Sequence, residues 1–373
     1  MTDSEAAGAG ELPRVTIGRT GLEVSRYGLG GFHQLEVSSE VVRRVVDAFL
    51  AEGGTYIETA RGYGDGASED KLGRALDGRR DRVVLASKTS AATADDARRD
   101  LETSLETLHT DHLEFYFFHG PDHEKLDRIT ARDGALVGLL AAKDEGLIDG
   151  LGLSSHTLDV YLDAFDRIPL DLILVWCNYL DNLNFPVIPD RILPEARERG
   201  IAVTAMKPLA DGFLHRSVES AIRFVLAEAD VAVCGTNAVE HVVEVARAVR
   251  KGPADAAERE AILRDAPELG TYVCRRCGDC PPELTDTFRL EGECDRQMLD
   301  YRPHDPADYA LRDRLSHWFS YSDAARAGFA GAGHDPEALL AAAARVDCPY
   351  GIDVVRKARL AIAKLTDGPV RRV

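Results

Sequence analysis

The sequence predicts a (β/α)8 barrel, the closed parallel sheet of the TIM type, followed by an appended C-terminal helical module. Eight short apolar runs alternate with segments that have the spacing of amphipathic helices, a pattern typical of a sheet closed by right-handed crossovers. A chain of 373 residues with 45% hydrophobic and 29% charged residues is long enough for both parts. The runs are Tyr27–Gly30, Tyr56–Glu58, Val83–Lys88, Leu113–His119, Gly150–Ser154, Leu172–Asn178, Ala202–Met206 and Val231–Cys234.

An open doubly wound sheet is the alternative that we weighed. Such a sheet normally has a GxGxxG turn after its first strand, and the glycines at 28, 30 and 31 do not have that spacing. The barrel is therefore the favoured fold class.

Composition shifts divide the chain into four parts. Residues 1–13 are acidic and rich in small residues, and we predict a disordered tail without a signal peptide or anchor. The barrel is expected over 14–250, and Val15–Ser25 alternates apolar and polar residues as a hairpin does. A segment rich in Gly, Pro, Asp and Ala predicts a linker at 251–267, and the helical module follows at 268–373.

Charge and cysteine content exclude several classes of partner. A net charge of -18 repels polyanions, so we expect no nucleic-acid surface, and no membrane segment is indicated. Seven cysteines in a chain without an export signal indicate a reducing compartment, the cytoplasm, where clustered cysteines usually bind metal. Cys177 and Cys234 lie in predicted strands and are expected to be small buried hydrophobes.

The segment 53–76 has the residues of a reactive loop, because it passes from a short strand through a glycine-rich loop into a helix. Polar side chains at the carboxyl end of a barrel strand point at a ligand, and Glu58 and Tyr63 are placed there. We predict that Ser68 caps the following helix. The loop glycines that permit a tight turn are Gly62, Gly64 and Gly66.

Six motifs resemble the aldo-keto reductases and follow one another in that family's order. The most specific is the first, in which the family usually has Asp at the position of Glu58. The resemblance implies a nicotinamide-dependent oxidoreductase that acts on a small carbonyl or alcohol. The motifs are YIETARGYGDGASEDKLGRAL, VVLASKT, LEFYFFHGPD, GLSSH, AMKPLADG and CGTNAVEHVVEV.

The resemblance assigns catalytic roles to four residues. Tyr63 is the proton donor, and because an isolated tyrosine has a pKa of about 10, a cation must assist it. Lys88 is that cation, Glu58 holds it in place, and His119 orients the carbonyl. Glu58 is one methylene longer than Asp, so its carboxylate must retract or Lys88 must shift.

The cofactor implied by the resemblance is NAD(P)H. Ser154 and Ser155 match the positions that hold the nicotinamide carboxamide. Asn237 replaces a basic residue that usually binds the 2′-phosphate, so a preference for NADPH is not expected. The other matching positions are Asn178, Lys207, Pro208, Leu209, Gly212, Gly235 and Glu244.

The C-terminal cysteines have the spacing of an iron–sulfur site. Cys274, Cys277 and Cys280 form C-x2-C-x2-C, and Cys348 is followed by Pro, as in ferredoxin-like [4Fe–4S] ligand sets. The pattern also resembles the C-terminal modules of some bacterial aldo-keto reductase relatives. Cys294 is a rival fourth ligand, and a zinc site or cysteines without metal are alternatives.

Two other functions stay open at this point. One is a cluster-dependent redox enzyme whose barrel binds the substrate, which would require an electron-transfer partner. The other is a regulatory or binding barrel that has kept only the fold. The sequence indicates a small-molecule substrate but neither its identity nor the oligomeric state.

Overall fold

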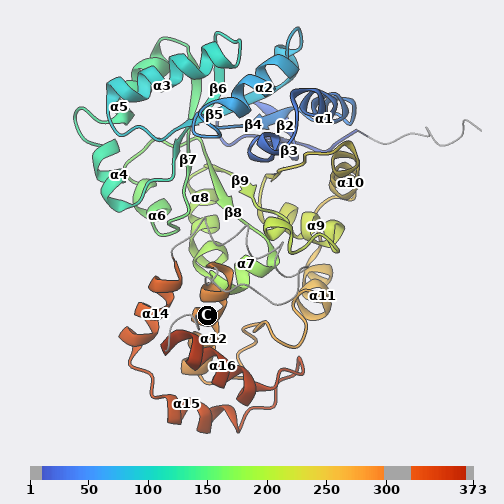
Figure 1. The fold of residues 1–373 in the computed structure, drawn as a ribbon, viewed down its shortest axis with the longest axis vertical. Helices are drawn as coiled ribbons and strands as arrows, with labels where there is room; N and C mark the ends of the chain where they lie inside the picture. Colours follow the sequence, from blue (N-terminus) through green and yellow to red (C-terminus); the bar gives the residue numbers. More distant parts are fainter. Residues whose placement is uncertain (1–10, 298–320, 367–373) are drawn as a thin grey trace, which may run out of the picture. The chain divides into compact units, whose positions relative to one another are not determined.

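The computed structural model describes residues 11–297 and 321–366 (Figure 1). It has two compact units. The barrel unit comprises Met1–Asn178, Val187–Pro208 and Val218–Ala254, and the C-terminal unit comprises Tyr179–Pro186, Leu209–Ser217 and Asp255–Val373. Most of the expected tail at 1–13 lies outside the described residues, and Leu12, near its end, is buried.

The barrel unit contains the eight parallel strands that the sequence predicts. They form a closed barrel in the order β10-β3-β4-β5-β6-β7-β8-β9, each pairing in parallel with its neighbours. The fold prediction is confirmed for this unit. The strands are β3 (Tyr27–Gly30), β4 (Tyr56–Glu58), β5 (Val84–Thr89), β6 (Leu113–His119), β7 (Ile148–Ser154), β8 (Leu172–Trp176), β9 (Ala202–Met206) and β10 (Val231–Cys234).

A two-stranded hairpin precedes the barrel, as expected. Strands β1 (Arg14–Thr16) and β2 (Glu23–Ser25) pair antiparallel. Ile17 and Val24 are fully buried in one cluster with side chains of the barrel strands. Gly18 has a φ of +46°, and a Cβ there would lie 2.9 Å from the carbonyl oxygens of Asp171 and Gly200, so only glycine fits.

Helices follow the strands of the barrel unit (Figure 1). Thr93 caps α3 by accepting a hydrogen bond from the backbone N–H of Asp96. The helical elements are η1 (Phe32–Glu36), α1 (Ser39–Ala51), α2 (Ala67–Ala75), η2 (Arg80–Arg82), α3 (Ala94–Thr107), α4 (His123–Ile129), α5 (Ala135–Asp144), α6 (Val160–Ala164), the π-helix η3 (Ile188–Ile192), α8 (Leu193–Glu198), α9 (Val218–Glu228) and α10 (Val239–Arg250).

The predicted cap of α2 is wrong. Gly66 is the N-cap residue, with a φ of 91°, and it makes no side-chain capping bond. Ser68 lies inside the first turn and is buried, and its hydroxyl bonds to Thr59 Oγ1 and the Gly31 carbonyl, both at 2.8 Å. The Ser68 hydroxyl therefore bonds to groups outside the helix instead of capping it.

The C-terminal unit is helical. Its core contains Leu284 and Phe288 of α12 together with residues of α14, α15 and α16. The expected linker at 251–267 contains α11, which begins with a capping box between Asp255 and Glu258. The elements are α7 (Tyr179–Asn184), η4 (Ala210–Gly212), α11 (Ala256–Asp265), α12 (Pro282–Gln297), α14 (Tyr321–Ala332), α15 (Pro336–Ala343) and α16 (Val354–Thr366).

Within residues 11–297 and 321–366, no helix is both long enough and apolar enough to cross a bilayer.

Candidate active site

The four predicted catalytic residues lie together at the carboxyl ends of neighbouring strands. Glu58 is the last residue of β4, Lys88 is the penultimate residue of β5, and His119 ends β6. Tyr63 lies in the loop between β4 and α2, and its ring contacts that of His119 edge to face, with centroids 5.6 Å apart. Reacting groups of barrel enzymes lie at this end of the strands.

Lys88 is the centre of the group. Its side chain is fully buried, and its ammonium donates to a carboxylate oxygen of Glu58, to the Thr59 carbonyl at 2.7 Å and to the Tyr63 hydroxyl at 3.3 Å. The longer carboxylate therefore does reach Lys88. Gly30 is paired with Glu58 in the adjacent strand, and a Cβ there would lie 3.4 Å from Glu58 Oε1, an ordinary contact distance.

Burial and the charge of Lys88 act in opposite directions on the pKa of Tyr63. Burial raises the pKa of Tyr63, and this effect outweighs the lowering influence of Lys88. The pKa of Lys88 is raised because the charges of Glu58 and Tyr63 outweigh its own burial. Lys88 acts on Tyr63 in the predicted direction, but the net shift keeps the phenol protonated at neutral pH, as a proton donor requires.

The loop that carries Tyr63 is fixed by a buried ion pair that the sequence did not reveal. Arg61 donates to Glu69 at 2.5 Å, and Glu69, fully buried in α2, also accepts from the Ser87 hydroxyl of β5 at 2.6 Å. A Cβ at Gly66 would stand 1.5 Å from the Arg61 guanidinium, so glycine is required where the guanidinium passes. These contacts hold the Tyr63 loop against the barrel.

We expect Glu58→Asp to lower turnover. The shorter side chain withdraws the carboxylate from Lys88, and a displacement of about 1 Å at a reacting centre costs up to ~10²-fold. Steady-state kinetics measure the change, with Glu102→Asp at the exposed ion pair to Arg98 as the matched control. An increase in turnover would show that the longer carboxylate misplaces Lys88.

His119 is predicted to stay neutral over the working pH range. Burial, with the charges of Lys88 and then Lys125, lowers its pKa to about 3, against about 6.5 in an unfolded chain. As the pH falls below ~6.5, the unfolded chain binds a proton at this ring and the folded chain does not. The free energy of unfolding is therefore highest above pH ~6.5 and decreases as the pH falls toward the pKa of the folded state.

Urea unfolding at pH 5 and pH 7 measures this effect. His119→Gln should make stability less dependent on pH in that interval. His123→Gln is the control of opposite sign, because Asp159 raises the pKa of His123 at the surface. An unchanged pH dependence for His119→Gln would contradict a neutral, buried ring.

Several predicted cofactor residues lie at the same end of the barrel unit. Ser154 ends β7 and is buried, and the Ser155 hydroxyl donates to the Pro121 carbonyl at 2.7 Å. Asn178 follows β8, and its amide donates to the Lys207 carbonyl beyond β9 at 2.9 Å. Lys207 has a φ of 56°, an uncommon value for a residue with a side chain that often marks functional loops.

The loop after β10 contacts the loop after β3, which sequence reasoning did not include. A Cβ at Gly235 would stand 2.1 Å from the His33 ring, so the absence of a side chain permits this approach. Asn237 donates to the Glu36 carboxylate at 2.9 Å, and buried Gln34 donates to the Thr236 carbonyl at 2.7 Å. The position expected to face a 2′-phosphate therefore has a carboxylate beside it.

The remaining cofactor positions are divided between the units. Glu244 is exposed on α10. Pro208 ends a segment of the barrel unit, whereas Leu209 and Gly212 belong to the C-terminal unit. Their part in a cofactor site stays a prediction.

The predicted cluster ligands all belong to the C-terminal unit. The charges of Cys277 and Cys348 raise the pKa of Cys274 in addition to its burial. Burial, followed by the charges of the other three, raises the pKa of Cys280 to about 11. Cys274, Cys280 and Cys348 all pack against the hydrophobic core of this unit. Among the described residues, no three His, Cys, Asp or Glu side chains form a site for a metal ion, so the predicted cluster is not confirmed.

Cys294 differs from this group in its burial. It is fully buried in α12, and its charged neighbours are Asp295, Arg326, Lys364 and Glu291. At 1.5 Å per residue, it lies about 18 Å along the helix from Pro282, two residues after Cys280. The predicted small buried residues, Cys177 and Cys234, are buried in the barrel unit.

A closed (β/α)8 barrel with a tyrosine, a lysine and a carboxylate joined at the ends of its strands defines a class of barrel enzyme. The chain belongs to the aldo/keto reductase family, whose model matches residues 26–262 and whose members are oxidoreductases. This confirms the family resemblance.

Individual relatives agree with that assignment. L-galactose dehydrogenase of Arabidopsis thaliana is 29% identical over 53% of this chain and 66% of its own length, just under two thirds. The oxidoreductase YrpG of Bacillus subtilis is 31% identical over 53% of this chain and 67% of its own. The holo structure of aldo-keto reductase AKR11C1 from Bacillus halodurans is 25% identical, covers 68% of this chain and 95% of its own, and has a TM-score of 0.60.

Proposed function

We propose that the protein is a nicotinamide-dependent oxidoreductase that interconverts a small carbonyl compound and its alcohol. The observation that carries the proposal is the buried Lys88 ammonium, which contacts the Tyr63 hydroxyl and the Glu58 carboxylate together. A structural lysine would need only the carboxylate, whereas the contact with a phenol suits proton transfer. Family membership supports the same reaction class.

The residues of the site suit the chemistry as follows. A reduced nicotinamide, when bound, supplies the hydride that reaches the carbonyl carbon. Tyr63 donates its phenolic proton to the carbonyl oxygen, and the Lys88 ammonium stabilises the tyrosinate that remains. Glu58 holds the ammonium in place. His119, neutral at its low pKa, lies beside Tyr63 and can hydrogen-bond the same oxygen.

The barrel unit has features that fit a nucleotide. Buried Ser154 and Asn178 lie at the strand ends, and Gly235 and Asn237 lie in the loop after β10, beside His33 and Glu36. Because Glu36 holds Asn237, a 2′-phosphate there would meet a carboxylate rather than a cation. We therefore propose that NADH binds at least as tightly as NADPH.

Titration of both nucleotides against the purified chain, followed by protein fluorescence, tests this proposal. Binding of either nucleotide, with oxidation at 340 nm when a small aldehyde is added, supports the reductase. Glu36→Gln should increase the affinity for NADPH more than the affinity for NADH. Absence of binding by both nucleotides would instead favour the regulatory or binding barrel.

We further propose that Cys274, Cys277, Cys280 and Cys348 hold a [4Fe–4S] cluster. Each thiolate of a cubane binds a different iron, so the sulfurs need not converge as they do around one ion. Cys274, Cys280 and Cys348 pack against one hydrophobic core, in the unit that also contains Cys277. The backbone N–H of Arg276 donates to Cys274 Sγ at 3.4 Å, a bond of the kind that tunes cluster thiolates. Cys348 is preferred to Cys294 because it is partly exposed and is followed by Pro, whereas Cys294 is fully buried in α12.

If a cluster is present, an alternative function is an iron–sulfur redox enzyme. Its barrel would bind the substrate, and an electron-transfer partner would exchange electrons with the cluster. Retention of carbonyl reduction after loss of the cluster favours the nicotinamide reaction; its abolition favours the alternative. A cytoplasmic location, where thiols stay reduced, belongs to the same proposal.

A further inference from the structure

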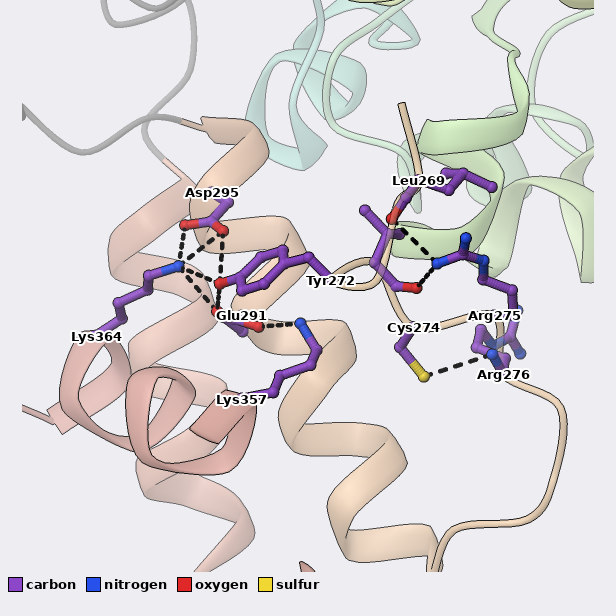
Figure 2. A network of polar contacts seen from close by, with 10 residues as sticks. Leu269, Tyr272, Cys274, Arg275, Arg276, Glu291, Asp295, Lys357 and Lys364 are labelled. Carbon is purple, nitrogen blue, oxygen red and sulfur yellow. Dashed lines mark hydrogen bonds and ion pairs between the residues drawn. The ribbon is translucent and has the colours of Figure 1, made fainter. Parts of the chain in front are cut away.

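A buried carboxylate lies beside the loop that carries Tyr63, and no step of the proposed reaction uses it. This is Glu69, in the first turn of α2, which is fully buried. Glu291 of the C-terminal unit is buried to the same extent, but it pairs with two lysines of α16 in its own unit (Figure 2). Glu69 pairs instead with Arg61, two residues before the proposed proton donor. Its surroundings therefore indicate what it serves.

The ion pair connects the Tyr63 loop to the elements around it. The Arg61 guanidinium donates to one carboxylate oxygen of Glu69 at 2.5 Å and to the Thr107 hydroxyl of α3 at 3.1 Å. The other carboxylate oxygen accepts from the Ser87 hydroxyl of β5 at 2.6 Å. One carboxylate and one guanidinium thus join the loop to α2, α3 and β5.

The same segments carry the two groups that must meet for proton transfer. Ser87 directly precedes Lys88 in β5, and the backbone N–H of Arg61 donates to the Lys88 carbonyl at 3.0 Å. Tyr63 closes a turn by donating its backbone N–H to the Ala60 carbonyl at 3.1 Å. A shift of Arg61 would therefore move the Tyr63 hydroxyl relative to the Lys88 ammonium.

Stability does not explain the ion pair. Burial raises the pKa of Glu69 and outweighs the lowering effect of the groups that bond to it. Ionisation of this carboxylate therefore lowers the free energy of unfolding. Buried ion pairs often stabilise a fold less than apolar side chains of similar size, whereas their directional bonds fix the geometry of the groups that they join. What the pair explains is the geometry of the loop.

We propose that Glu69 and Arg61 are positioning residues of the reductase site, which hold the Tyr63 hydroxyl at the Lys88 ammonium. The inference rests on the proposed function, in which Tyr63 is the proton donor. The contact between hydroxyl and ammonium, at 3.3 Å, is already long for a hydrogen bond from a charged donor, so it tolerates little displacement. A displacement of about 1 Å at a reacting centre costs up to ~10²-fold in rate.

The test measures kcat, KM and nucleotide affinity for Glu69→Gln in the full chain. NADH or NADPH is the hydride donor, and 4-nitrobenzaldehyde and butanal are the carbonyl probes. The substitution keeps the shape of the side chain and an acceptor for the Ser87 hydroxyl, and it removes the charge that pairs with Arg61. The same substitution is also made in the Tyr63→Phe chain.

Glu114→Gln is the matched control in the barrel unit. Glu114 accepts from the Arg80 guanidinium at 2.9 Å and from the backbone N–H of Leu85 at 2.6 Å. It is the second residue of β6, whereas His119 of the proposed site is the last residue of that strand. The control therefore removes the charge of a second carboxylate that pairs with an arginine, away from the strand ends that carry the site.

For Glu69→Gln we expect kcat to fall by about tenfold, with nucleotide affinity within about threefold of the wild type. In the Tyr63→Phe chain the same substitution should lower kcat by less than about twofold, because the hydroxyl that it positions is absent. A general loss of stability would instead lower kcat by the same factor in both chains. Glu114→Gln should stay within about threefold of its parent chain.

The double variant Arg61→Met/Glu69→Gln carries the comparison if Glu69→Gln does not fold or Tyr63→Phe is too slow to compare. It removes both charges of the pair, so neither is left buried without a partner. We expect a thermal midpoint close to that of the wild type, together with a kcat that is still about tenfold lower.

Equal losses of kcat from Glu69→Gln in the wild-type and Tyr63→Phe chains would overturn the inference. Wild-type kcat in a folded Arg61→Met/Glu69→Gln chain would do the same, as would failure of both variants to fold, since the pair would then serve stability. A wild-type chain that binds neither nucleotide, or reduces neither probe, would refute the proposed function itself, and the positioning role with it. That result is distinct, because it appears before any residue is changed.

Discussion

Replacement of Tyr63 by Phe should lower turnover by about 10²- to 10⁴-fold, the usual contribution of a general acid. The substitution removes only the hydroxyl that contacts Lys88. The ring keeps its edge-to-face contacts with Phe32 and His119, so the loop should hold its shape. Because the change affects only the proton donor, kcat should fall while nucleotide affinity is retained, as measured by steady-state kinetics and nucleotide titration.

Tyr116→Phe is the matched control. It removes another buried phenol, whose hydroxyl bonds to the Ser104 hydroxyl at 3.1 Å rather than to Lys88. We expect its turnover to stay within about threefold of the wild type. Activity of Tyr63→Phe within tenfold of the wild type would exclude Tyr63 as the proton donor.

Replacement of Cys277 or Cys348 by Ser should reduce the bound iron to background and loosen residues 274–366. A ligand set present only in the folded state makes metal binding part of the free energy of folding, and the bond from the loop to Cys348 closes nearly seventy residues. The barrel unit has its own core and should stay folded. Iron analysis and hydrogen exchange resolved by segment measure the two effects.

Cys294→Ser and Cys177→Ser are the controls, because both thiols are buried, whereas the four proposed ligands are partly or fully exposed. Neither change should lower the iron content. Stoichiometric zinc without labile sulfide in the anaerobic wild type, or loss of iron in Cys294→Ser with full iron in Cys348→Ser, would show that the ligand assignment is wrong.

The barrel could be predicted because each strand is encoded locally. Tyr56–Glu58 and Leu113–His119 are strands with the predicted bounds, since short apolar runs buried on both faces have a clear signature. The catalytic assignments came from the family resemblance together with the position of polar residues at strand ends, and they stay predictions. Helix α11 was missed because the Gly and Pro content of 251–267 masked the capping box at Asp255 and Glu258.

The ion pairs could not be predicted, because their partners are distant in sequence. Glu69 and Glu291 have the spacing of ordinary surface charges on helices, yet both are fully buried. Arg61 and Lys357 become their partners only when the chain folds. The net upward shift of the pKa of Tyr63 has the same origin, since burial is a property of the packed loop.

Isotope transfer tests the central claim most directly. The wild-type chain is incubated with NADH or NADPH deuterated at C4 of the nicotinamide, as each stereoisomer, together with small aldehydes, and the alcohols are analysed by mass spectrometry. We predict deuterium on the former carbonyl carbon with one stereoisomer, and its loss in Tyr63→Phe. Alcohol without deuterium from either stereoisomer, or no alcohol from a folded chain with either nucleotide, would contradict the account.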